Sequence, residues 1–119
     1  MITTDDFFGE QVISGRLFDA LLVLVNDIGP AQIKITKSQI AFCRKRAFAW
    51  VWIPGRYLHG KVAPLVLTIT FRKRDPSPRW KQIVEPAPGR FMQHLEVYSS
   101  TDLDPQVRDW LKTAWDDAR

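Results

Sequence analysis

The sequence predicts an α+β domain, a two-layer sandwich in which an antiparallel sheet of about five strands carries the N-terminal and C-terminal helices on one face. Three observations support this fold class. Apolar residues recur at helical spacing near both chain ends, they alternate with polar residues between positions 31 and 98, and the links between the alternating segments are short. The 119 residues fit a single domain, 1–119, since a second hydrophobic core needs a longer chain.

The first long helix is expected over residues 14–28. Ser14 is placed to cap its N-terminus through the side-chain hydroxyl. Gly29-Pro30 ends the helix, because glycine adopts the left-handed conformation of a C-cap and proline cannot continue a helix. A short helical turn is expected before it, at residues 5–9, with Phe7 and Phe8 folded inward. The apolar stripe of the long helix consists of Leu17, Leu21, Leu24, Val25 and Ile28, widened by Phe18 and Leu22.

The middle of the chain has the two-residue period of strands. A short, weaker candidate lies at residues 81–85, before the last of the clear segments. Because the segments follow one another with short links, we expect an antiparallel meander. The clear segments are 32–36, 39–44, 47–53, 65–72 and 91–98.

The alternation also predicts which side chains share a face. Ala49, Val51 and Ile53 have the same phase as the aliphatic set of the next strand, so both sets are expected to face the helices. Phe48, Trp50 and Trp52 then belong to the opposite face, which is left open to solvent or to a partner. The other expected members of that open face are Lys34, Thr68, Thr70 and Arg72, and the helix-facing aliphatic set is Leu65, Leu67, Ile69 and Phe71.

A second long helix is expected to close the chain. Asp104 is a suitable N-cap and Pro105 occupies the first helical position, where its missing N–H costs nothing. The apolar stripe that this helix presents to the sheet consists of Val107, Trp110, Leu111 and Ala114.

Charge is unevenly distributed along the chain. The whole sequence has 17 basic and 13 acidic residues, a net charge of +4. Residues 31–90 hold 13 basic residues against two acidic ones, a net of +11, whereas the two ends together carry −7. A positive sheet between negative helices points to an anionic partner.

Several classes of protein are excluded by composition. The single cysteine, Cys43, permits no intrachain disulfide, and we expect it to be a small buried side chain. No apolar run approaches the ~20 residues of a membrane span, and the acidic start lacks the basic region of a signal peptide. The two histidines, His59 and His94, cannot build a zinc site with one cysteine. We therefore expect a cytoplasmic protein with no cofactor, no metal site and no membrane contact, and we nominate no catalytic residue.

Three sequence runs resemble a known family. They are Lys37-Ser38-Gln39-Ile40-Ala41-Phe42, Arg46-Ala47-Phe48-Ala49-Trp50-Val51-Trp52 and Asp75-Pro76-Ser77-Pro78-Arg79-Trp80, and they resemble the bacterial domain of unknown function 5655. The likeness extends from about residue 8 to residue 118 and implies the fold but no activity. A weaker similarity, in topology alone, links the chain to the frataxin-like MmcQ/YjbR proteins, for which DNA binding has been suggested.

The best candidate site combines basic strand ends with aromatic side chains. Rings stack on bases while Lys and Arg neutralise phosphates, so this combination suits nucleic acid or another anionic ligand. Two alternatives stay open. The basic clusters can be solvated turns that protect sheet edges, and the tryptophans can fill a small second core or a homodimer interface. The candidate residues are Arg44, Lys45, Arg46, Trp50, Trp52, Arg72, Lys73 and Arg74.

A different class of function is a small-molecule-binding or enzymatic domain with a pocket near Trp80 and His94. A histidine acting as a general base needs an orienting partner and a cavity. The competing interpretation is a structural histidine held by a hydrogen bond.

Overall fold

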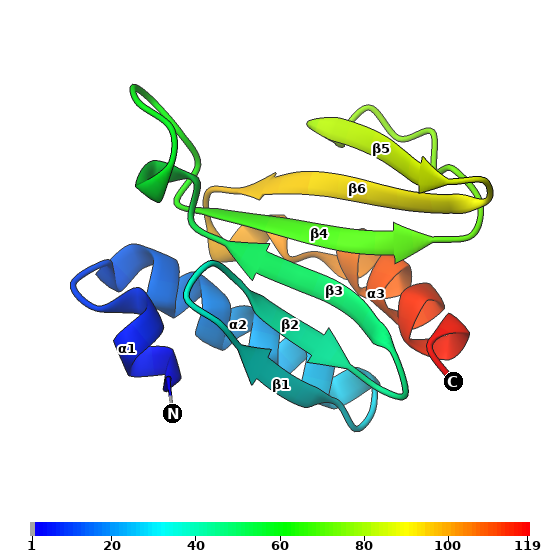
Figure 1. The fold of residues 1–119 in the computed structure, drawn as a ribbon, viewed down its shortest axis with the longest axis horizontal. Helices are drawn as coiled ribbons and strands as arrows, with labels where there is room; N and C mark the ends of the chain where they lie inside the picture. Colours follow the sequence, from blue (N-terminus) through cyan, green and yellow to red (C-terminus); the bar gives the residue numbers. More distant parts are fainter. Residues whose placement is uncertain (1) are drawn as a thin grey trace.

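One antiparallel sheet forms the front layer of the computed structural model, which describes residues 2–119 (Figure 1). Helices α2 and α3 lie side by side behind it, so the fold is α+β with the helices on one face (Figure 1). The elements are α1 (Thr4–Phe8), α2 (Val12–Ile28), β1 (Gln32–Ile35), β2 (Ile40–Cys43), β3 (Ala47–Trp52), β4 (Leu65–Phe71), β5 (Gln82–Ala87), β6 (Arg90–Val97) and α3 (Pro105–Asp117), with 3₁₀ turns at Pro54–Arg56 and Ser100–Asp102.

The sheet has six strands in the order β1-β2-β3-β4-β6-β5. The expected meander is correct for the first four strands and wrong for the last two, because β6 lies between β4 and β5. The weak segment at 81–85 forms an edge strand that pairs with β6 alone. Its Pro86 fits an edge position, where a missing backbone donor interrupts no second ladder.

The N-terminal helices begin differently from the prediction. The short helix α1 is present, with Phe7 and Phe8 buried as expected. Helix α2 starts at Val12, two residues before the predicted start, and Gln11 makes no side-chain cap bond. Ser14 is therefore not the N-cap: it is buried inside the first turn and its hydroxyl donates to the Pro64 carbonyl at 2.6 Å. This bond joins α2 to the segment that leads into β4.

Gly29 follows the last residue of α2, but a glycine is needed there for a different reason from the predicted left-handed cap. Its φ of 166° is extended backbone, not the left-handed conformation. The requirement comes from packing, because a Cβ at this position would lie 2.4 Å from Cζ2 of Trp115. The indole Nε1 of Trp115 also donates to the Pro30 carbonyl at 3.0 Å, so the end of α2 is fastened to α3.

A β-bulge corrects the predicted position of Phe48. The register of β2 and β3 shifts between Phe42, which pairs with Ala49, and Cys43, which pairs with Ala47. Phe48 is the extra residue, and a bulge of this kind re-aims one side chain. It is fully buried on the helix-facing side, next to Phe42, which in turn stacks on Phe18 of α2 at 5.9 Å. Trp50 and Trp52 keep the predicted open face.

Helix α3 begins as predicted and its end is anchored by the sheet. Asp104 caps the helix by accepting from the Val107 N–H at 3.1 Å, and Pro105 is the first helical residue. At the other end, the backbone N–H groups of Lys45 and Arg46 both donate to the Ala118 carbonyl, at 3.0 and 3.3 Å. The turn between β2 and β3 thus satisfies a carbonyl that a helix end leaves without a partner.

Within residues 2–119, no helix combines the length and the apolar character that crossing a membrane requires.

Candidate anion-binding pocket

Four segments meet at one end of the sheet and line a partly open pocket of about 430 Å³. They are the start of β3, the end of β4, the turn between β5 and β6, and the last turn of α3, which lie together at the right of Figure 1. We name this cavity the arginine pocket, because three arginines are among its lining residues. Its lining consists of Arg46, Arg72, Arg90, Trp50, Thr70 and Asp117, together with Ala47, Phe71, Gly89, Ala114 and Ala118.

The sheet topology explains why the arginines converge. Strands β3 and β4 are antiparallel, so Arg46, just before β3, lies at the same end as Arg72, just after β4. Strand β6 runs antiparallel to β4 and therefore begins at this end, with Arg90 as its first residue. Gly89 makes the preceding turn with a φ of +73°, which L-residues with side chains rarely adopt.

Two of the three arginines donate hydrogen bonds to the end of α3. Arg46 donates to the Asp117 carbonyl at 2.9 Å, and Arg72 donates to the same carbonyl at 3.4 Å. Arg72 also lies 4.0 Å from the Asp117 carboxylate. These contacts suit the negative end of a helix dipole, and they hold both guanidinium groups at the pocket.

Arg90 is different from the other two. It is exposed, and its guanidinium has no hydrogen-bond or ion-pair partner within residues 2–119. The pocket lining therefore includes three cationic residues and one acidic residue, and the Arg90 donors are free for a ligand. Such a site can accept an anion.

The structure brings together only some of the residues that the sequence nominated. Arg46, Trp50 and Arg72 line the pocket. Arg44 does not: its guanidinium lies 3.6 Å from the Trp115 ring and donates to the Trp115 carbonyl, so it packs against α3. Trp52 lies further along β3, beside Tyr57 at 6.3 Å. The remaining nominated residues do not line the pocket and are exposed on the adjacent turns: Lys45, Lys73 and Arg74.

Arg90 is the pocket arginine that the candidate set from the sequence does not include. It belongs to the basic middle of the chain but to neither of the clusters at residues 44–46 and 72–74. The available signal was its place directly after Pro88-Gly89 at the start of a strand. This position in the sequence does not predict that Arg90 lies near Arg46 and Arg72, because that proximity depends on the placement of β6 beside β4 in the sheet.

The rest of the open face continues from the pocket along one cross-strand row. Trp50 pairs with Thr68, which pairs with His94. The Thr68 hydroxyl and His94 Nδ1 are 2.6 Å apart, and burial lowers the pKa of His94. This histidine has the hydrogen-bonded partner that a structural role implies. Trp50 and Trp52 are half-buried.

Comparison with known proteins gives one result for the chain. The family model described as domain of unknown function (DUF5655) matches residues 9–118. The chain belongs to this family. No curated protein and no solved structure matches it significantly.

The DUF5655 run from Asp75 to Trp80 has a structural role in this chain. The Asp75 carboxylate accepts from the indole N–H groups of Trp80 and Trp110, each at 3.0 Å, and from the Ser77 N–H. Burial opposes ionisation of Asp75, but these hydrogen bonds outweigh it and lower its pKa. The fully buried Gln93 holds the Asp75 backbone through both its amide atoms. We name the cluster of Asp75, Trp80, Gln93 and Trp110 the tryptophan brace.

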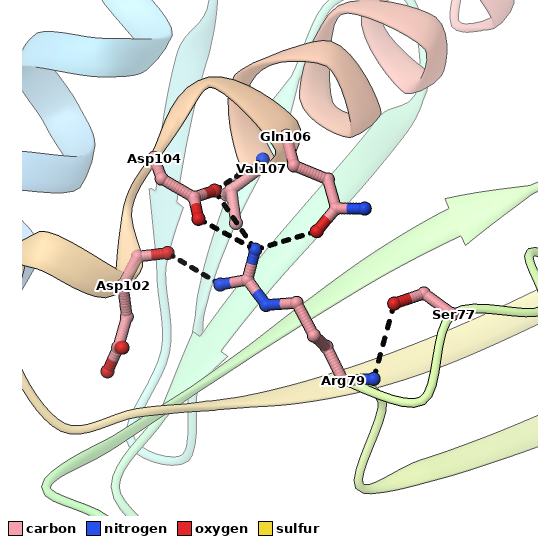
Figure 2. A network of polar contacts seen from close by, with 6 residues as sticks. All are labelled: Ser77, Arg79, Asp102, Asp104, Gln106 and Val107. Atoms are coloured by element: carbon pink, nitrogen blue, oxygen red, sulfur yellow. Dashed lines mark hydrogen bonds and ion pairs between the residues drawn. The ribbon is translucent and has the colours of Figure 1, made fainter.

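Arg79 of the same run makes four side-chain hydrogen bonds with the start of α3 and the turn before it (Figure 2). Its Nη1 donates to both carboxylate oxygens of Asp104 and to Gln106 Oε1, and its Nη2 donates to the Asp102 carbonyl. Burial opposes ionisation of Asp104, but the bonds from Val107 and Arg79 and the guanidinium charge hold its pKa below the usual range. In this DUF5655 member, Arg79 therefore anchors the N-terminus of α3.

The placement of Trp80 separates it from His94. Trp80 packs on the Trp110 ring of α3, with centroids 4.3 Å apart, on the helix side of the sheet. His94 lies on the open face with Thr68. The two side chains do not face a common space. Cys43 is a free, buried thiol, and among the described residues no three His, Cys, Asp or Glu side chains gather at metal-binding distance.

Proposed function

We propose that this DUF5655 domain is a non-catalytic binding module for single-stranded nucleic acid, which it holds at the arginine pocket and along the adjoining open face. The observation that carries this proposal is the convergence of Arg46, Arg72 and Arg90 beside the half-buried ring of Trp50. Cations next to an accessible aromatic ring match the two parts of a nucleotide.

The phosphate contacts follow from the chemistry of arginine. A guanidinium group presents its N–H donors in a planar fork that fits two phosphate oxygens at once. Arg90 has all of these donors available, and Arg46 and Arg72 are already held in place by the end of α3. The exposed Lys45, Lys73 and Arg74 of the adjacent turns add attraction for phosphates outside the pocket.

The base contacts use the tryptophans of β3. Trp50 lines the pocket and Trp52 follows it on the same face, about 7 Å further along the strand. Stacking of a base on an aromatic ring contributes ~1–3 kcal/mol and is tolerant of sequence. A strand that enters the pocket would meet Trp50 first and Trp52 second.

The test is fluorescence anisotropy with labelled single-stranded DNA and RNA at low and moderate salt. We expect micromolar binding that weakens steeply with salt, because counterions are released from neutralised phosphates. Arg90→Gln removes one phosphate contact and should reduce the salt slope by about one. Arg16→Gln is the matched control, since this exposed arginine lies at the other end of the molecule, on α2.

Absence of binding at low salt, or equal losses in both variants, would contradict the proposal. Sedimentation of the same samples tests the alternative that the tryptophan face is a homodimer interface. A protein that is dimeric at assay concentration and loses exposure of Trp50 and Trp52 in the dimer would assign this face to self-association instead.

A further inference from the structure

The arginine pocket has the dimensions of a site for one nucleotide. Its volume of about 430 Å³ lies in the usual range for small-ligand pockets. Residues of β3, β4, the β5–β6 turn and α3 line it, and the pocket is open to solvent on its remaining side. One nucleotide, free or at the end of a strand, therefore fits the space that these elements line.

The charge of the pocket also distinguishes between kinds of phosphate. A phosphodiester inside a strand carries one negative charge, whereas a phosphate monoester carries about −1.5 to −2 at pH 7 and has three terminal oxygens. Three guanidinium groups against a single carboxylate have more charge than a diester neutralises. A monoester dianion fits this balance better.

We infer that the arginine pocket binds the phosphate monoester of a nucleotide, either at the phosphorylated end of a strand or in a free mononucleotide, with the base against Trp50. This inference rests on the proposed function and names the group that the site takes. Arg90 supplies the donors that have no internal partner, and Arg46 and Arg72 complete the cradle.

Substitutions of Asp117 and Arg90 are expected to change phosphate binding in opposite directions. Its carboxylate is 37% exposed and lies 4.0 Å from Arg72, so it competes with a bound phosphate for the same guanidinium group. Removing this charge should tighten phosphate binding, whereas removing Arg90 should weaken it. A structural role for these residues does not predict opposite signs.

The experiment compares oligonucleotides of one sequence that carry a 5′-phosphate, a 3′-phosphate or hydroxyls at both ends, together with the free mononucleotide. We expect one phosphorylated form to bind about tenfold more tightly than the hydroxyl form, the effect of one charge-assisted contact. Arg90→Gln should abolish that preference and Asp117→Asn should enlarge it. The preference should also decrease at pH 5, because the second pKa of a monoester is about 6.

The outcomes separate the two proposals. Equal affinity for all oligonucleotides would overturn the inference and leave nucleic-acid binding intact. Tight mononucleotide binding without oligonucleotide binding would support the monoester site and overturn the proposed function. Equal melting temperatures of Arg90→Gln and the unchanged protein would show that a lost preference does not come from unfolding.

Discussion

The two ends of helix α3 use arginine in opposite ways. At the N-terminus, Arg79 has Asp104, Gln106 and the Asp102 carbonyl as partners (Figure 2), so both of its terminal nitrogens are bonded within the fold. At the C-terminus, Arg46 and Arg72 share one backbone carbonyl, and the Arg90 guanidinium has no partner among the described residues. An arginine with satisfied donors stabilises the protein, whereas one with unsatisfied donors is available for a ligand.

The largest effect should come from the tryptophan brace. Trp110→Ala removes a ring that packs on Trp80 and whose indole N–H bonds Asp75. Loss of a buried aromatic side chain costs ~3–5 kcal/mol of unfolding free energy, measured by urea denaturation. Trp110→Phe retains most of the packing and should lose clearly less. A loss below 1 kcal/mol in Trp110→Ala would show that the brace does not support α3.

A smaller loss is expected where α2 meets the end of α3. Gly29→Ala places a Cβ 2.4 Å from the Trp115 ring, and overpacking of this kind costs ~1–3 kcal/mol. The measurement is again the free energy of unfolding. Gly60→Ala is not a suitable comparison because Gly60 has a φ of +87°, but Gly55→Ala, which meets only ordinary contacts, should change stability little. Equal effects at Gly29 and Gly55 would contradict this explanation of Gly29.

Arg79→Gln should have a moderate, pH-dependent effect of about 1 kcal/mol, because the ion pair with Asp104 is partly exposed and screened. The folded state lowers the pKa of Asp104 below its ordinary value of 3.8. A lowered carboxyl pKa stabilises the protein above the unfolded-state pKa, and this contribution is lost as pH falls through the folded-state pKa. Denaturation at pH 7 and pH 3 should therefore show a smaller difference between variant and unchanged protein at pH 3. A constant difference would argue against the ion pair as the cause.

Arg90→Gln should have the smallest effect on stability, within about 0.5 kcal/mol, as for surface substitutions that break no contact. Its melting temperature checks this expectation at the same salt concentration as the binding assay. A large decrease would mean that Arg90 supports the fold, and the contrast between the two ends of α3 would no longer hold.

Local patterns predicted the elements better than their arrangement. The capped start of α3 at Asp104-Pro105 and the burial of Phe7 and Phe8 could be read from neighbouring residues. Phe48 was placed on the wrong face, since a bulge depends on the register with β2 and leaves no mark on the alternation of β3 alone. For the candidate site, the basic strand ends directed attention to Arg46 and Arg72, but not to Arg90.

By itself, the sequence determined the α+β class, the family, the strand and helix segments and the concentration of positive charge in the sheet. Those properties depend on residue type and on short periods along the chain. Only the tertiary structure decided that β6 lies beside β4, that Arg44 packs on Trp115, and that Arg46, Arg72 and Arg90 share one pocket. The physical reason is that strand order and side-chain convergence depend on contacts between residues far apart in sequence, which no local pattern encodes.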